Sequence, residues 1–187
     1  MDVRQSGRLM GLVMTVLFSL ASTAHAHAPA PPAESRLEYL SVDEISRRME
    51  RNELSAAMFV LYLQRRIAAL DKQGPKINAV IELNPEALAI AEFLDRERKS
   101  GYVRGPLHGI PVLLKDNIDT SDQMQTSAGS LAMVGDPPAK DAFIVQRLRE
   151  AGAIILGKTN LSEWAAFRDP ALPSGWSGRG WPGSAAG

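Results

Sequence analysis

The sequence predicts an α/β fold in which helices cover a largely parallel or mixed sheet. Three apolar runs, at residues 77–83, 110–114 and 153–156, have the length and the polar flanks of strands. Segments with the apolar spacing of helices lie between them. A chain of 187 residues, 45% of them hydrophobic, can bury the core of a single domain.

Two helices are expected before the first strand. Residues 41–44, Ser-Val-Asp-Glu, form a capping box that opens a short helix ending near Asn52. A longer helix is expected from about Ser55 to Lys72, where Gly74 and Pro75 end it. We interpret its methionine and aromatic residues as core, and the residues at helical spacing are Met58, Leu61, Tyr62, Arg65, Ala68 and Ala69.

A strand, a helix and a second strand follow. Residues 77–83 form the first of these strands, Asn84 caps the next helix and Pro85 starts it. This helix runs to a charged, solvated end at 95–99, and its apolar face consists of Ala87, Leu88, Ala91 and Leu94. The second strand is 110–114.

The next helix is expected from about Ala142 to Glu150, with apolar residues Phe143, Ile144, Val145 and Leu148, and it leads into the strand 153–156. Thr159 or Asn160 caps one more helix, which contains Leu161, Trp164 and Phe167. From Asp169 onward glycine and proline are frequent, so no helix or strand of useful length is expected there.

Composition disfavours several classes of partner. Basic and acidic residues number 21 each, so there is no broad positive field for nucleic acid. The chain has no cysteine, so its stability must come from the core rather than from disulfides. Its histidines, at 25, 27 and 108, lack the spacing of metal ligands, so no metal site is predicted.

The first 26 residues resemble a secretory signal peptide. Arg4 and Arg8 precede an apolar run at 9–20, and Ala24-His-Ala26 is a cleavage site of small residues. Cleavage after Ala28 is an alternative, as is an uncleaved anchor, although a membrane-spanning helix needs about 20 apolar residues. Residues 27–36 form a spacer rich in proline and alanine. We therefore expect a periplasmic or secreted protein that does not stay in the membrane after cleavage.

Lys115 is the candidate catalytic residue. It follows the apolar strand 110–114, where burial could disfavour the ammonium form and lower the pKa of the amine. A lysine that loses its proton in this way can act as a base. In the alternative, its stem packs on the strand while the amine reaches water.

The surrounding residues favour the first of these interpretations. The run 105–119, GPLHGIPVLLKDNID, followed by Thr126-Ser-Ala-Gly-Ser130 and by the segment 151–164, closely resembles the amidase signature family. The resemblance extends from about Leu37 to about Ser177. It implies a partial amidase-signature α/β/α fold whose C-terminal part is missing, with a mixed sheet covered by helices. It also implies cleavage of carboxamide C–N bonds, in a small amide or peptide amide, without a cofactor.

The resemblance implies a Ser-Ser-Lys triad in which Lys115 is the base. The lysine deprotonates a bridging serine, which activates the nucleophilic serine, and backbone N–H groups stabilise the oxyanion. Both serines belong to a glycine-serine-rich loop that, in the family, follows the region present here. Ser184 lies in a segment like the opening of that loop, but its neighbours depart from the pattern, so we interpret it as an ordinary loop serine. The 187 residues alone are therefore expected to be inactive, and a noncatalytic remnant is the alternative function.

Two groups of residues are expected to support the site. Asp116, Asn117 and Asp119 can close an Asx-type turn and so fix the loop that aims Lys115. The segment 126–130 resembles a loop that packs beside the reacting serines, and Gly129 allows close backbone approach. The supporting residues predicted from both groups are Asp116, Asn117, Ser127, Ala128, Gly129 and Ser130.

A remote alternative is nucleotide binding, because residues 152–159 match the phosphate-loop pattern G-x-x-x-x-G-K-[ST]. A phosphate loop needs a flexible turn between its glycines, so that backbone N–H groups can surround the phosphates. Here the intervening residues are Ala, Ile, Ile and Leu, which form the predicted strand itself, and a helix precedes the first glycine. The context therefore disfavours this alternative.

Overall fold

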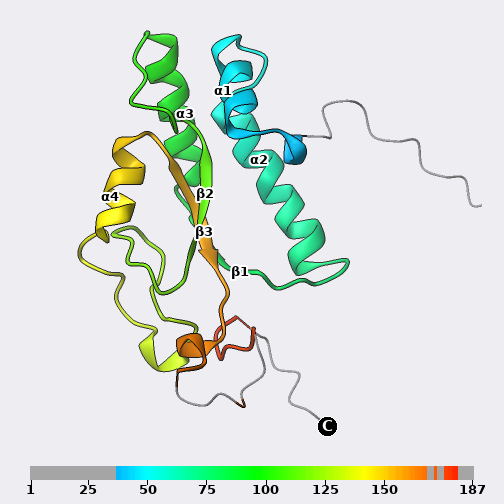
Figure 1. Ribbon diagram of the computed structural model, residues 1–187, viewed down its shortest axis with the longest axis vertical. Coiled ribbons are helices and arrows are strands. Elements are labelled where there is room, and N and C mark those ends of the chain that lie inside the picture. Colours follow the sequence, from blue (N-terminus) through cyan, green and yellow to red (C-terminus); the bar gives the residue numbers. More distant parts are fainter. Residues whose placement is uncertain (1–36, 168–170, 172–174, 181–187) are drawn as a thin grey trace, which may run out of the picture. The chain divides into compact units, whose positions relative to one another are not determined.

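The computed structural model describes residues 37–167, 171 and 175–180. Its sheet has the strand order β1-β3-β2, formed by β1 (Val80–Leu83), β3 (Ile154–Thr159) and β2 (Pro111–Lys115) (Figure 1). The central strand β3 is antiparallel to β1 and parallel to β2. The predicted α/β fold with a mixed sheet is confirmed.

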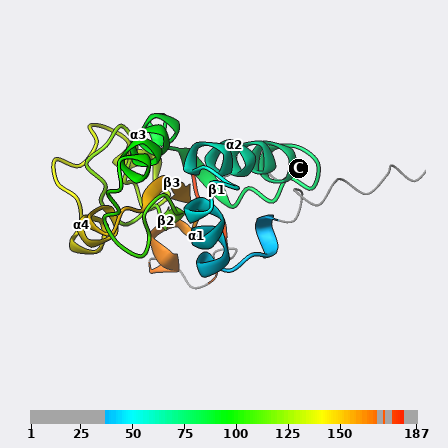
Figure 2. The same cartoon turned by 90° about the horizontal axis from the view of Figure 1, so that it is seen from above.

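Helices cover both faces of this sheet. In both views α4 (Phe143–Glu150) and α2 (Ala56–Ile67) lie on opposite sides of the strands (Figures 1 and 2). Side chains of α1 (Val42–Glu50), α2 and α3 (Ala87–Lys99) pack in one cluster with Ile154 and Leu156 of β3. Ile155, which lies between those two residues, packs in a second cluster with Val145 of α4. The alternation of side chains along β3 thus separates two apolar layers.

The helix starts follow the predicted caps. Ser41 and Ser55 precede α1 and α2, and their hydroxyl groups accept hydrogen bonds from Glu44 N (3.2 Å) and Met58 N (3.0 Å). The second helix continues to Lys72, as expected, but its last turn is a π-helix, Ala68–Lys72. The third start was predicted two residues too early: α3 begins at Ala87 rather than at Pro85, and Asn84 Oδ1 accepts from Glu86 N at 2.9 Å in the turn before the helix.

The predicted buried face of α2 is wrong except at Tyr62, which is partly buried and packs against the core. Met58 is 60% exposed and Leu61 is also exposed, whereas Ala56, Phe59 and Val60 are buried. The reason is a long-range contact that local spacing does not show. Asp95 of α3 accepts hydrogen bonds from Ala56 N (2.8 Å) and Ala57 N (3.0 Å), which turns the N-terminal end of α2 toward α3.

The predicted helix after β3 is also wrong. Only a 3₁₀ turn, Glu163–Ala166, forms there, and Trp164 and Ala165 have positive φ. Asn160 does not cap a helix, because its side chain binds residues distant in sequence. Its Nδ2 donates to Gly175 O at 3.2 Å, and its Oδ1 accepts from Ser177 Oγ at 2.6 Å.

Strand limits differ from the prediction by up to three residues. β1 starts at Val80 rather than at 77, and β3 continues through Gly157, Lys158 and Thr159. The helix before Gly152 and the extended backbone after it are confirmed by α4 and β3. No turn therefore separates the two glycines of the phosphate-loop pattern.

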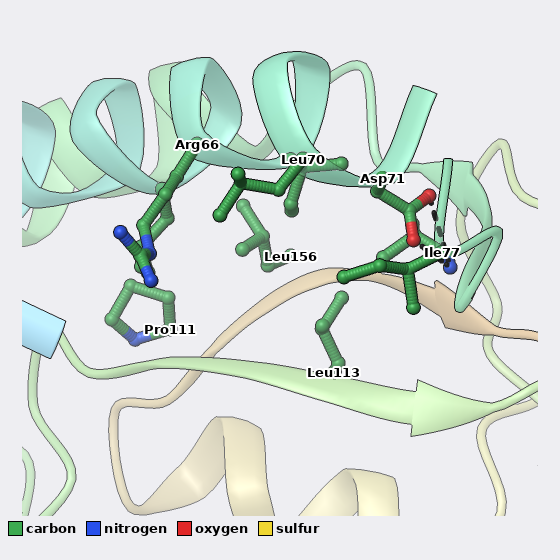
Figure 3. Close-up of a pocket in the computed structure, with 10 residues that line it drawn as sticks. Arg66, Leu70, Asp71, Ile77, Pro111, Leu113 and Leu156 are labelled. Carbon is green, nitrogen blue, oxygen red and sulfur yellow. Dashed lines mark hydrogen bonds between the residues drawn. The ribbon is translucent and has the colours of Figure 1, made fainter. Parts of the chain in front are cut away.

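The cover of α2 over the sheet is incomplete. A cavity of about 330 Å³ lies between α2 and the strands, and Leu70, Leu156 and Leu113 are among the residues that line it (Figure 3). Leu113 is 38% exposed although it belongs to a strand.

Other predictions lie outside the described residues, among them the signal peptide, the spacer and Ser184. In the part of the chain that the structure describes, no helix is long and apolar enough to cross a membrane. Within the same residues, no cluster of three or more His, Cys, Asp or Glu side chains could hold a metal ion.

Candidate active site

Lys115 ends β2, next to the start of a tight turn. It pairs with Thr159 in the parallel register, and its carbonyl accepts a hydrogen bond from Ile118 N at 3.0 Å. Asp116 N donates to Thr159 O at 3.1 Å, which keeps the turn against β3. The Lys115 residue itself is exposed. Within the residues that the structure describes, the expected shelter from water is therefore not present, because β2 lies at an edge of their sheet.

Asp116 is fully buried and binds the loop formed by residues 127–130. Its Oδ2 accepts hydrogen bonds from Ser127 Oγ (2.5 Å), Ser127 N (3.3 Å) and Gly129 N (3.0 Å). Its carbonyl accepts from Ser127 N and Ala128 N, both at 3.1 Å. Ala128 and Gly129 have φ of 49° and 78°, a left-handed pair that turns these N–H groups toward the carboxylate and the carbonyl of Asp116.

Arg179 joins the C-terminal segment to this loop. Its Nη1 donates to Asp116 Oδ1 at 3.1 Å, its Nη2 donates to Glu82 of β1, and its backbone N donates to Gly129 O at 2.9 Å. Because Asp116 and Arg179 are both largely buried, this ion pair is poorly screened by water. Arg179 was not predicted from the sequence, where its only signal is a single charge within a run of glycines.

The structure brings some of the predicted supporting residues together and leaves others apart. Ser127, Ala128, Gly129 and Ser130 are all buried, and the first three contact Asp116. Asn117 and Asp119 are exposed. Asp116 thus fixes the loop by reaching across to residues 127–129 rather than through the local Asx turn that we expected.

Lys158 is the other lysine of this region, and it is fully buried. Its Nζ donates hydrogen bonds to Ile118 O and to Thr126 Oγ1, both at 2.8 Å. Burial lowers the pKa of the Lys158 amine, and the nearby carboxylates oppose this shift, Asp116 most strongly. Sequence analysis considered Lys158 only as a phosphate-loop lysine.

A second cavity, also of about 330 Å³, adjoins the 127–130 loop. Ser130, Met133 and Trp164 are among the residues that line it. The loop and the 3₁₀ turn are joined directly, since Trp164 N donates to Ala128 O at 3.0 Å. The site therefore combines an exposed lysine, a loop with left-handed backbone and an adjacent hollow.

A family model described as Amidase matches residues 59–171. The chain belongs to the amidase family. A protein named as a probable amidase of Arabidopsis thaliana is 47% identical over 150 residues, which are 79% of this chain and 28% of the relative.

Solved structures of amidases have the same fold over most of this chain. The peptide amidase of Stenotrophomonas maltophilia has a TM-score of 0.72 and 56% identity, over 75% of this chain and 28% of its own. An amidase family protein of Bacillus anthracis has a TM-score of 0.74 and 38% identity, over 78% and 29% of the two chains. The chain thus spans little more than a quarter of the length of these relatives, and it matches amidase-signature structures over that part.

Proposed function

We propose that this amidase chain supplies the lysine strand of a hydrolase that cleaves carboxamide C–N bonds through a Ser-Ser-Lys triad, with Lys115 as the base. The observation that carries the proposal is the position of Lys115. It stands at the end of β2, one residue before the carboxylate that holds the 127–130 loop. Family membership supports the reaction class.

In the proposed mechanism, neutral Lys115 takes a proton from the bridging serine, and that serine takes the proton of the nucleophilic serine. The nucleophilic oxygen attacks the amide carbon, backbone N–H groups bind the oxyanion, and the leaving amine receives the proton. Water then cleaves the acyl-enzyme by the reverse sequence. The exposed position of Lys115 supports a further part of the proposal: the two serines come from outside residues 37–180, and the 187 residues alone do not hydrolyse amides.

For the substrate we propose a peptide amide. The support is the 56% identity to a structure described as a peptide amidase. The hollow beside Ser130 is lined by Met133 and Trp164, which suit an apolar side chain next to the scissile amide.

The test is a graft in which this chain replaces the matching part of the Stenotrophomonas maltophilia peptide amidase. We expect the graft to release ammonia from a peptide amide, and Lys115→Ala to lower kcat by about 10⁴-fold. Lys115→Arg should be equally inactive, because a guanidinium does not release its proton. Lys140→Ala, which changes an exposed lysine that makes none of the contacts described above, is the control. Turnover that survives Lys115→Ala would show that another group is the base.

We also propose export, on the basis of residues 1–26. Mass spectrometry of the N-terminus after expression in a bacterium with a periplasm should find a chain that starts at His27 or Pro29. Cytosolic protein that retains Met1 would contradict export and leave the proposed chemistry unaffected.

A further inference from the structure

We propose that Lys158 is a positioning residue: it holds the backbone turn that begins at Lys115 and so fixes the orientation of the Lys115 side chain. The inference extends the proposed function, because it concerns the residue assigned there as the base. It rests on the contacts of the Lys158 amine, which join the two ends of the loop 118–126.

Two hydrogen bonds connect Lys158 to Lys115 through Ile118. Lys158 Nζ donates to Ile118 O at 2.8 Å, and Ile118 N donates to Lys115 O at 3.0 Å. The two hydrogen bonds therefore involve the carbonyl oxygen and the N–H group of the same residue, Ile118. A displacement of Ile118 therefore opens the turn that begins at Lys115.

Thr126 connects Lys158 to the 127–130 loop. Thr126 Oγ1 accepts from Lys158 Nζ at 2.8 Å, and Thr126 is followed by Ser127, which binds Asp116. The same amine therefore anchors the residue that leads into the loop beside Lys115. The Lys158 amine thus contacts both the turn after Lys115 and the residue that leads into the loop, in addition to the direct contacts of Asp116 with the loop.

Burying the Lys158 amine costs free energy, because the amine loses its contact with water. Lys158 has no exposed surface, and its stem occupies a position in β3 that an apolar side chain of similar size could fill. The carboxylates whose charge favours the protonated amine are Asp116, Asp122, Glu82 and Asp119. An apolar residue would fill the space but could not donate to Ile118 O or to Thr126 Oγ1. Thr126 Oγ1 also donates to Ile118 O directly, at 3.4 Å, so the amine adds a second connection with two shorter hydrogen bonds.

The first experiment uses the 187-residue chain and needs no catalytic activity. Amide hydrogen exchange is measured by NMR in the wild type, in Lys158→Met and in the control Lys140→Met. In Lys158→Met the Ile118, Ser127 and Gly129 amides should exchange about tenfold faster or more, while the Ile154 amide of β3, bonded to Ile110 O at 2.9 Å, should not change. The side-chain Cε signal of Lys115, assigned with Lys115→Arg, should move in Lys158→Met and stay in Lys140→Met.

Two results would overturn the proposal. Equal loss of protection in the sheet and the loop would show that Lys158 only fills the core, and an unchanged Lys115 signal would show that it positions nothing. If Lys158→Met does not fold, Lys158→Leu replaces it, because leucine also fills apolar space without donating to Ile118 O or to Thr126 Oγ1. Lys158→Leu should raise the exchange rate of the Ile118 amide in the same way, and an unchanged rate would equally refute the proposal.

The grafted enzyme separates this inference from the proposed function. There Lys158→Met should lower kcat roughly 10- to 100-fold with KM unchanged, because a misplaced base slows the reaction without loosening the substrate. A graft that stays active with Lys115→Ala would refute the assignment of the base, while the exchange result would still report whether Lys158 holds the turn.

Discussion

Gly157 and Lys158 are neighbours in β3, but the first has no room for a side chain and the second has room for a long one. At Gly157 the backbone of β1 comes so close that a Cβ would lie 2.4 Å from Glu82 O. At Lys158 the long side chain is enclosed by the loop that follows β2. Gly152, with φ of 87°, would place a Cβ 2.6 Å from His108 Cα. Close packing thus accounts for the residues that match a phosphate-loop pattern in this chain.

The first prediction concerns Gly157. Gly157→Ala should lower the free energy of unfolding by about 2 kcal/mol, because the atom that the new methyl group meets belongs to the backbone of β1. Urea unfolding followed by circular dichroism measures the change. Gly135→Ala is the matched control, since nothing lies within 4 Å of a Cβ at that position. Similar midpoints for the two variants would mean that β1 and β3 are not this close in solution.

The second prediction concerns His108, which is 2% exposed. Its Nδ1 accepts from Arg104 N at 3.1 Å and its Nε2 lies 2.9 Å from Leu94 O, so the neutral ring already uses both nitrogens. Burial lowers the pKa of His108, and the charges of Arg98 and Arg104 lower it further, while the hydrogen bond to Leu94 and the charge of Glu97 raise it.

The folded chain therefore binds this proton less readily than the unfolded chain, whose histidine titrates near 6.5. Stability is fully present above that pH and is lost as the pH falls from about 6.5 toward the lower pKa of the folded state, by at most about 1.4 kcal/mol per pH unit. Urea unfolding between pH 7.5 and 5.5 should show this slope. His108→Gln, which keeps an amide donor near Leu94 O, should remove it. A slope that persists in the variant would assign the effect to another group.

At the scale of elements, apolar runs and caps were sufficient to predict the strands and most helix starts. Contacts between residues far apart in sequence account for what was missed. The spacing of Leu161, Trp164 and Phe167 is helical. However, Asn160 binds Gly175 and Ser177, and Trp164 binds Ala128, so no helix forms. Within the candidate site, Lys115 and the 127–130 loop were named from the sequence. The contact between Arg179 and Asp116 spans 63 residues, and no local pattern indicates it.

The third prediction tests the contact that sets the rotation of α2. Asp95→Ala should lower the free energy of unfolding by about 2 kcal/mol, because two backbone N–H groups at the start of α2 lose a charged acceptor. Glu92→Ala, at an exposed position of the same helix, should change it by less than about 0.5 kcal/mol. Both values come from thermal and urea unfolding. Equal losses of unfolding free energy in the two variants would indicate that stability depends on the negative charge of α3 and not on the hydrogen bonds to the start of α2.

At the scale of the whole molecule, the sheet of the described residues has open edges. β2 pairs only with β3 among these residues, so its other side presents backbone N–H and C=O groups without a strand beside them. The cavity under α2 opens beside the same strand, with Leu113 at its margin (Figure 3). The relatives are more than twice as long over their whole chains, and in this chain the apolar edge is exposed.

The fourth prediction follows from this edge. A chain that starts at His27, and therefore lacks the apolar run 9–20, should still self-associate through β2, because an unpaired apolar edge strand accepts the same strand of a second copy. Leu113→Lys puts a charge on this edge and should raise the protein concentration needed for association about tenfold or more. Val103→Lys also adds a charge at an exposed apolar position, 50% exposed and outside the strands, and should leave association unchanged. Light scattering after size exclusion, over a hundredfold range of concentration, measures the three chains. A wild-type chain that stays monomeric throughout, or equal suppression by both lysine variants, would show that the β2 edge does not drive the association.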